Sequence, residues 1–124
     1  MSIRRQDAET TIHELAGAEC DGLIGLGRTR GELELLFLRA GGIWHRLFLD
    51  EGVLFWGPWA PEDEHSEMPQ FGLLRTQPPG AGSIETITMV AGVLTVRFGG
   101  GVALVVTEAA TGDLQCRWES TTND

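Results

Sequence analysis

Short apolar runs separated by glycines dominate the chain from residue 21 onward. This pattern is typical of β-strands joined by tight turns. In the last run, Leu114, Cys116 and Trp118 alternate with polar residues, which gives the strand one apolar and one charged face. We expect two groups of strands, near residues 22–28, 32–39, 43–49 and 52–57 and near residues 84–90, 92–98, 102–108 and 113–119.

One helix is expected before these strands. Thr11 and Glu14 fit a capping box, in which the two side chains bond to the first backbone N–H groups of a helix. A short apolar stripe follows and ends at Gly17. The pattern predicts a short helix over residues 10–20, after a loose N-terminus at residues 1–9.

The two groups of strands resemble each other. The motif of the first group recurs in the second in the same order, as Leu33-x-Leu35-x-Phe37 and Leu94-x-Val96-x-Phe98. This similarity predicts an internal repeat of two β-meanders, at residues 22–57 and 83–119. A meander has one apolar face to bury, so two meanders are expected to cover each other. The predicted fold class is mainly β: two four-stranded antiparallel meanders that form a sandwich or flattened barrel, with one short N-terminal helix.

A proline-rich, acidic stretch at residues 58–82 separates the meanders. It holds all five prolines of the chain and four clustered acidic residues, Glu62, Asp63, Glu64 and Glu67. Proline fits neither a helix interior nor a central strand, so we expect a long connection here. With a loose C-terminus at residues 120–124, the 124 residues are interpreted as a single domain.

The charge balance narrows the classes of partner. Nine arginines oppose eighteen acidic residues, which gives a net charge of −9. This field repels phosphate backbones and anionic lipids, so we expect no nucleic-acid or membrane partner and favour a basic protein surface. The two cysteines lie far apart, and no apolar signal segment is recognised. A small cytoplasmic protein of bacterial type, with reduced thiols, fits these features.

Known catalytic and metal-binding motifs are missing from the sequence. No serine lies in a G-x-S-x-G turn, and the run at residues 99–101 lacks the Lys-Ser or Lys-Thr of a phosphate-binding loop. His13, His45 and His65 are scattered, and the acidic residues at 62–67 lack the glycine and the alternation of a calcium loop. We therefore predict no catalytic residue, no metal and no cofactor, and we favour a binding protein over an enzyme.

Aromatic residues gather just before the acidic stretch. Four tryptophans and five phenylalanines are present, and five of them lie between residues 44 and 59. Large aromatic rings beside carboxylates are typical of recognition hot spots for basic partners. We expect a non-catalytic interaction module whose contact residues are Trp56, Trp59, Glu62, Asp63, Glu64 and Glu67. The alternative is that these rings plug the end of the sandwich beneath the long connection.

Other hypotheses stay open at this point. A small-ligand-binding protein or enzyme would need a pocket between the meanders, and Trp44 and His45 are candidates to line it. In size, charge and aromatic content the chain is similar to small acidic bacterial antidotes that occupy the basic active site of a toxin, so a toxin–antidote role is a further expectation. Adjacent apolar residues, such as Val105-Val106, place apolar side chains on both strand faces, which fits a homodimer.

Overall fold

Strands dominate the computed structural model, which describes residues 4–6, 10–12, 15–64, 67–73 and 82–120. No α-helix occurs in this part of the chain; a short 3-10 helix, η1, spans Pro61–Asp63. The strands in chain order are β1 (Arg4–Gln6), β2 (Thr10–Ile12), β3 (Glu19–Thr29), β4 (Glu32–Ala40), β5 (Ile43–Asp50), β6 (Val53–Pro58), β7 (Gln70–Gly72), β8 (Gly82–Val90), β9 (Val93–Phe98), β10 (Val102–Glu108) and β11 (Leu114–Ser120).

The eight strands predicted from the apolar runs are confirmed as β3–β6 and β8–β11. Within each group, every strand pairs antiparallel with the next one along the chain. Three of the connecting turns, Gly41-Gly42, Glu51-Gly52 and Ala91-Gly92, have positive φ at both residues: 59° and 82°, 52° and 79°, and 52° and 78°. This geometry matches the right-handed twist of the flanking strands, which is why such turns form tight hairpins.

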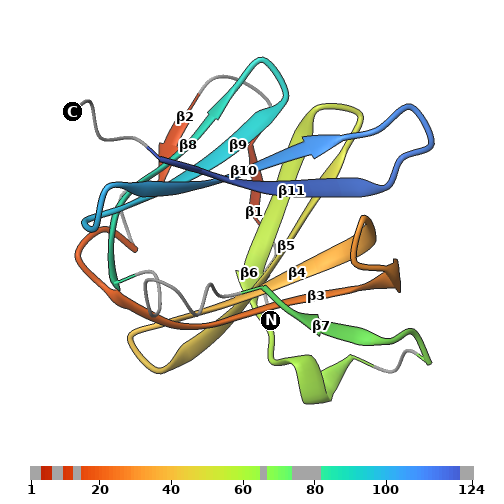
Figure 1. Ribbon diagram of the computed structural model, residues 1–124, viewed down its shortest axis with the longest axis horizontal. Helices are drawn as coiled ribbons and strands as arrows, with labels where there is room; N and C mark the ends of the chain where they lie inside the picture. Colours follow the sequence, from red (N-terminus) through yellow and green to blue (C-terminus); the bar gives the residue numbers. More distant parts are fainter. Residues whose placement is uncertain (1–3, 7–9, 13–14, 65–66, 74–81, 121–124) are drawn as a thin grey trace.

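Six of these strands close into an antiparallel barrel in the order β3, β4, β11, β10, β9, β8 (Figure 1). Two short seams complete the ring. β4 meets β11 at the pair Leu33 and Leu114, and β3 meets β8 at Glu19–Ser83 and Cys20–Gly82. Because the seams are short, the barrel is joined more loosely there than along its hairpins, and the prediction of a sandwich or flattened barrel fits in outline.

The remaining strands extend the sheet beyond the barrel. β5, β6 and β1 continue from β4, while β2 adds to β8 and β7 adds to β3. The proline-rich stretch therefore contributes an edge strand, β7, which the sequence pattern did not predict. Just after β7, the backbone N–H of Leu73 donates to the carbonyl of Leu23 at 2.8 Å, and the Leu73 side chain is buried in the core.

The helix predicted over residues 10–20 is wrong. Thr10–Ile12 form β2 and pair with Ile87–Met89 of β8, residues 15–17 form a turn, and Glu19 begins β3 (Figure 1). A helix of two turns gains little from its own hydrogen bonds, whereas strand pairing buries Ile12 in the core. Tertiary pairing therefore outweighs the local capping pattern.

The internal repeat is not confirmed. In β9, Leu94, Val96 and Phe98 all belong to the core cluster. In β4 the core residues are Leu33, Leu36, Leu38 and Ala40, whereas the buried ring of Phe37 lies outside that cluster. A register shift between β3 and β4 at Leu26 and Gly27 changes the alternation along β4. The two similar motifs therefore present different faces.

Candidate functional site

The acidic segment that follows β6, residues 59–64, meets the outer face of β5. Successive side chains of a strand point to opposite faces, so Trp44, Arg46 and Phe48 share one face of β5 while His45 and Leu47 share the other. Leu47 belongs to the core cluster, so Arg46 lies on the face opposite the core. Arg46 makes the side-chain contacts between β5 and this segment.

Arg46 binds the segment through its guanidinium group. Its Nη1 donates to Oε2 of Glu64 at 2.9 Å, and its Cζ lies 4.4 Å from the ring centroid of Trp59. The side chains of Arg46 and Glu64 are only 15% and 21% exposed, so the ion pair is partly shielded from water. Charge-assisted hydrogen bonds and cation–π contacts are stronger under such shielding. The two contacts hold Trp59 and Glu64 against β5.

Backbone hydrogen bonds fix the same segment. The N–H of Trp59 donates to the carbonyl of Trp44 at 3.1 Å. Within η1, the N–H groups of Asp63 and Glu64 donate to the carbonyls of Ala60 and Pro61 at 3.0 and 3.1 Å. Proline suits the first turn of such a helix because it has no N–H group, and an N–H at that position would have no acceptor within the helix. The segment is thus held by both main-chain and side-chain contacts.

The four predicted carboxylates fall into two groups. Glu64 is half-buried and paired with Arg46, while Glu62, Asp63 and Glu67 are exposed. Glu62 and Asp63 belong to η1, so their backbone positions are fixed by the bonds described above. In the part of the chain that the structure describes, no ion pair engages these three exposed residues. Their charges are therefore directed to solvent.

The predicted aromatic contact residues also separate. Trp56 belongs to the core, is 3% exposed, and has its ring centroid 5.9 Å from that of His45. Trp59 is half-buried, with one ring face taken by Arg46. Trp56 therefore has no surface to offer to a rigid partner. The alternation of Phe55 and Trp56 along β6 could have distinguished the buried Trp56 from the half-buried Trp59.

Trp44 and His45, the proposed pocket residues, do not face a common space. They are adjacent in β5 and therefore point to opposite faces. Trp44 covers Gly22, where an added Cβ would lie 2.7 Å from Cη2 of Trp44. Among the described residues, a shallow depression without room for a water molecule is lined by residues 55–59 with Arg46 and Phe48, and a concavity of about 200 Å³ lies on β10 and β11. Neither is lined by Trp44 or His45.

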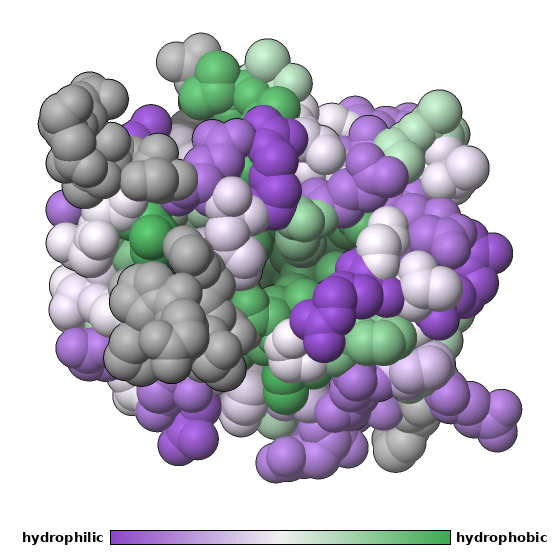
Figure 2. All heavy atoms as spheres, in the orientation of Figure 1, coloured by the Kyte–Doolittle hydropathy of each residue, from purple (hydrophilic) through white to green (hydrophobic). Residues whose placement is uncertain are grey.

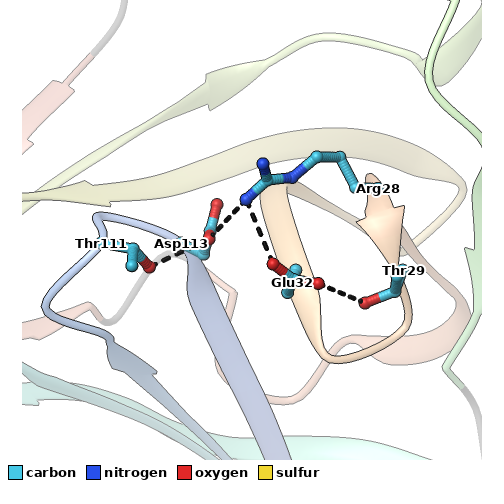
Figure 3. A network of polar contacts seen from close by, with 5 residues as sticks. All are labelled: Arg28, Thr29, Glu32, Thr111 and Asp113. Atoms are coloured by element: carbon cyan, nitrogen blue, oxygen red, sulfur yellow. Dashed lines mark hydrogen bonds and ion pairs between the residues drawn. The ribbon is translucent and has the colours of Figure 1, made fainter.

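A polar network that sequence reasoning missed lies at the seam between β4 and β11 (Figure 3). Nη2 of Arg28 donates to Asp113 at 3.0 Å and to Glu32 at 3.1 Å, and the Thr111 hydroxyl donates to Asp113 at 3.0 Å. Asp113 is 8% exposed, which is rare for a carboxylate unless it is paired. Its position beside the Leu33–Leu114 pair indicates a structural role in closing the barrel.

The two thiols are unreactive at neutral pH. Burial raises the pKa of Cys20 to about 11, and the nearby Asp21 and Glu19 charges add to the shift. Burial raises the pKa of Cys116 to about 12. Both thiols are protonated at neutral pH, so neither is a competent nucleophile there.

The described ranges lack a cluster of metal ligands. No group of three or more His, Cys, Asp or Glu residues in them could hold a metal ion; His13 and His65 lie outside these ranges. Within the same ranges, no helix is long and apolar enough to span a membrane.

Comparison with known proteins found no match to a family model, a curated protein or a solved structure.

Proposed function

We propose that this chain is a non-catalytic interaction module that binds a basic protein surface through its acidic segment, residues 59–64, together with Glu67. The contact residues are Trp59, Glu62, Asp63, Glu64 and Glu67. The observation that carries the proposal is the attachment of this segment to β5 by Arg46, at 2.9 Å from Glu64 and 4.4 Å from the Trp59 ring.

The attachment of this segment to β5 matters because a flexible surface loses conformational entropy when it becomes ordered on binding a partner. A segment that is already ordered in the free protein avoids that cost, and more of its interaction energy appears as affinity. Pro61 is buried, and the η1 backbone is hydrogen-bonded. Glu62 and Asp63 are therefore presented in a fixed arrangement, unlike charges on a flexible loop.

Charge supports the same class of partner. The net charge of −9 steers basic proteins toward this chain and raises their association rate at low salt. Exposed carboxylates at Glu62, Asp63 and Glu67 supply hydrogen-bond acceptors for arginine and lysine at the point of contact. An antidote that covers the basic active site of a toxin would use these features, and this is the role that we propose.

Trp56 is left out of this contact surface because its indole is buried in the core. It directly precedes Gly57, Pro58 and Trp59 in the chain. A role for Trp56 in binding would require its side chain to leave the core.

A chemical-shift titration with a strongly basic peptide tests the proposal. A deca-arginine peptide is added to the ¹⁵N-labelled full chain, and the backbone amides that shift are mapped. The proposal expects the largest changes at residues 59–64 and at Glu67. Changes spread evenly over all acidic residues, or centred on another face, would contradict it.

A further inference from the structure

One edge of β11 has no strand beside it over most of its length. β11 pairs with β10 along its length, from Leu114 to Ser120, but it pairs with β4 only at Leu114. Among the described strands, none pairs with residues 115–120 on the side away from β10. Proteins usually protect such edges with proline, lysine or a bulge, because free main-chain groups can pair with another strand. β11 contains no proline and its pairing with β10 has no bulge, so the charged residues Arg117 and Glu119 are its only such protection.

The hydrogen-bond pattern shows which main-chain groups face this edge. The Asp113 carbonyl accepts from the N–H of Ala109 at 2.8 Å, so the Asp113 main chain faces the β10 side. In an antiparallel strand, successive residues direct their N–H and C=O groups to alternate sides. Leu114 therefore faces β4, in agreement with its pairing to Leu33. By the same alternation, Cys116 and Trp118 direct their main-chain groups to the free edge.

A hollow lies near this edge, where Nε1 of Trp118 donates to the carbonyl of Leu73 at 3.0 Å. Figure 2 shows a hollow with hydrophobic residues at its base in the middle of the view, in the region that Figure 1 shows below β11. A separate concavity of about 200 Å³ lies over the β10–β11 pair and is lined by Thr107, Gln115, Cys116 and Arg117. The side chains of Arg117 and Glu119 project from the same strand face, form an ion pair with each other at 2.6 Å and are 60% and 47% exposed, so in the dimer proposed below each would exchange its partner for one in the second copy.

We propose that the free edge of β11 binds β11 of a second copy of this chain, so that the protein forms a two-fold symmetric dimer through an intermolecular antiparallel strand pair. A two-fold axis makes the same strand face itself, so the sequence of β11 must be complementary to its own reverse. The proposal uses a different surface from the acidic segment and is independent of the function proposed above.

Charge selects one register for this pairing. Cys116 and Trp118 must both face the partner, so the axis can pass through Cys116, Arg117 or Trp118. An axis through Arg117 places the two arginines opposite each other, and an axis through Cys116 places Arg117 opposite a glutamine. With the axis at Trp118, each Arg117 lies opposite Glu119 of the second copy. Opposite charges directly across two strands stabilise the pair and like charges destabilise it, so the register centred on Trp118 is favoured.

Sedimentation velocity of the full chain over a range of concentrations tests the dimer. The wild-type chain should dimerise. Arg117→Glu and Glu119→Arg should each raise the dissociation constant by about tenfold or more, because each places like charges across the pair. The double variant, R117E with E119R, should restore dimerisation. Arg97→Glu on β9 and Glu85→Arg on β8 are exposed controls with the same charge changes, and they should dimerise like the wild type.

Cysteine cross-linking tests the register separately. Chains with Arg117→Cys mixed with chains carrying Glu119→Cys should form an intermolecular disulfide, while chains with Arg117→Cys alone should not. Circular dichroism checks that every variant keeps its strand content. A wild-type chain that stays monomeric at all concentrations, a dimer that the charge reversals do not weaken, or cross-linking by Arg117→Cys alone would overturn the proposal.

Discussion

The guanidinium group of Arg46 lies over the indole ring of Trp59, 4.4 Å from its centroid. Arg46 comes from β5 and Trp59 from the residues just after β6, so the contact joins the barrel sheet to the connection that carries the acidic residues. The same guanidinium binds Glu64 at 2.9 Å. One side chain thus adds two contacts to the main-chain hydrogen bonds that hold the segment on which the proposed binding depends.

Replacing Arg46 with glutamine should loosen the acidic segment without unfolding the protein. The variant loses a shielded ion pair and a cation–π contact, which together stabilise the fold by about 1–2 kcal/mol. Hydrogen exchange should become faster at the amides of Asp63 and Glu64 and stay unchanged at the core amides of β9 and β10. The control is Arg39→Gln, which removes an exposed 3.6 Å pair with Asp21 and should leave exchange at 63 and 64 as it is.

Asp113 should be important for stability although it is far from the acidic segment. Asp113→Asn keeps the shape of the side chain but weakens the bonds from Arg28 and Thr111 at a site that is 8% exposed. We expect a loss of about 1–3 kcal/mol in the free energy of unfolding, measured by urea denaturation. Glu32→Gln, which changes the exposed partner of the same arginine, should cost less than about 1 kcal/mol. Equal losses of stability for the two variants would contradict a role for Asp113 in closing the barrel.

Gly27 should tolerate no side chain. A Cβ there would lie 2.2 Å from the carbonyl oxygen of Glu32 and 2.6 Å from Cα of Leu33, and main-chain atoms cannot move away cheaply. Gly27→Ala should destabilise the protein by about 3 kcal/mol. Gly31→Ala is the matched control, because a Cβ at Gly31 meets nothing within 4 Å, and its effect should stay within about 0.5 kcal/mol. Thermal unfolding of the two variants measures the difference.

The buried thiols should make the protein less stable at alkaline pH. The pKa values of Cys20 and Cys116 are raised from 9.0 to about 11 and about 12 in the folded chain. The unfolded chain therefore releases these protons at lower pH than the folded chain does. The stabilisation is complete below about pH 9 and is lost as the pH rises toward 11 and 12.

Urea midpoints at pH 8, 9, 10 and 11 measure this effect. They should fall with pH in the wild type, and the fall should be shallower in Cys116→Ala. An identical slope in the two proteins would show that Cys116 does not contribute. Iodoacetamide at pH 8 should also modify the native thiols far more slowly than the thiols of the urea-unfolded chain.

The strands of this fold are readable from sequence because their signals are local. Glycines mark the turns and alternating residues mark the faces, so each strand from Glu19–Thr29 onward could be placed except β7. The closure of the barrel could not be predicted, because Leu33 meets Leu114 across most of the chain. β2 was misread for a related reason: its pairing with β8 is a non-local contact that a capping pattern does not reveal.

The candidate site was readable only in part. Acidic and aromatic composition identified the stretch that holds Trp59 and Glu64, but it did not distinguish buried Trp56 from half-buried Trp59. The period-2 pattern of β6 contains that distinction, since Leu54 and Trp56 share the core face. Arg46 was missed because its contact with Glu64 depends on how the connection folds back over β5. Its place between Trp44 and Phe48 on one strand face was the available signal.

The most direct measurement of the proposed function is calorimetric titration of deca-arginine into two triple variants. In the first, Glu62→Gln, Asp63→Asn and Glu67→Gln neutralise the acidic segment. In the second, Glu34→Gln, Asp50→Asn and Glu85→Gln neutralise three exposed acids elsewhere, so both variants lose the same amount of charge. If the acidic segment is the contact surface, the first variant should bind at least about tenfold more weakly than the second. Equal affinities would mean that only net charge attracts the peptide, and the proposed site would be rejected.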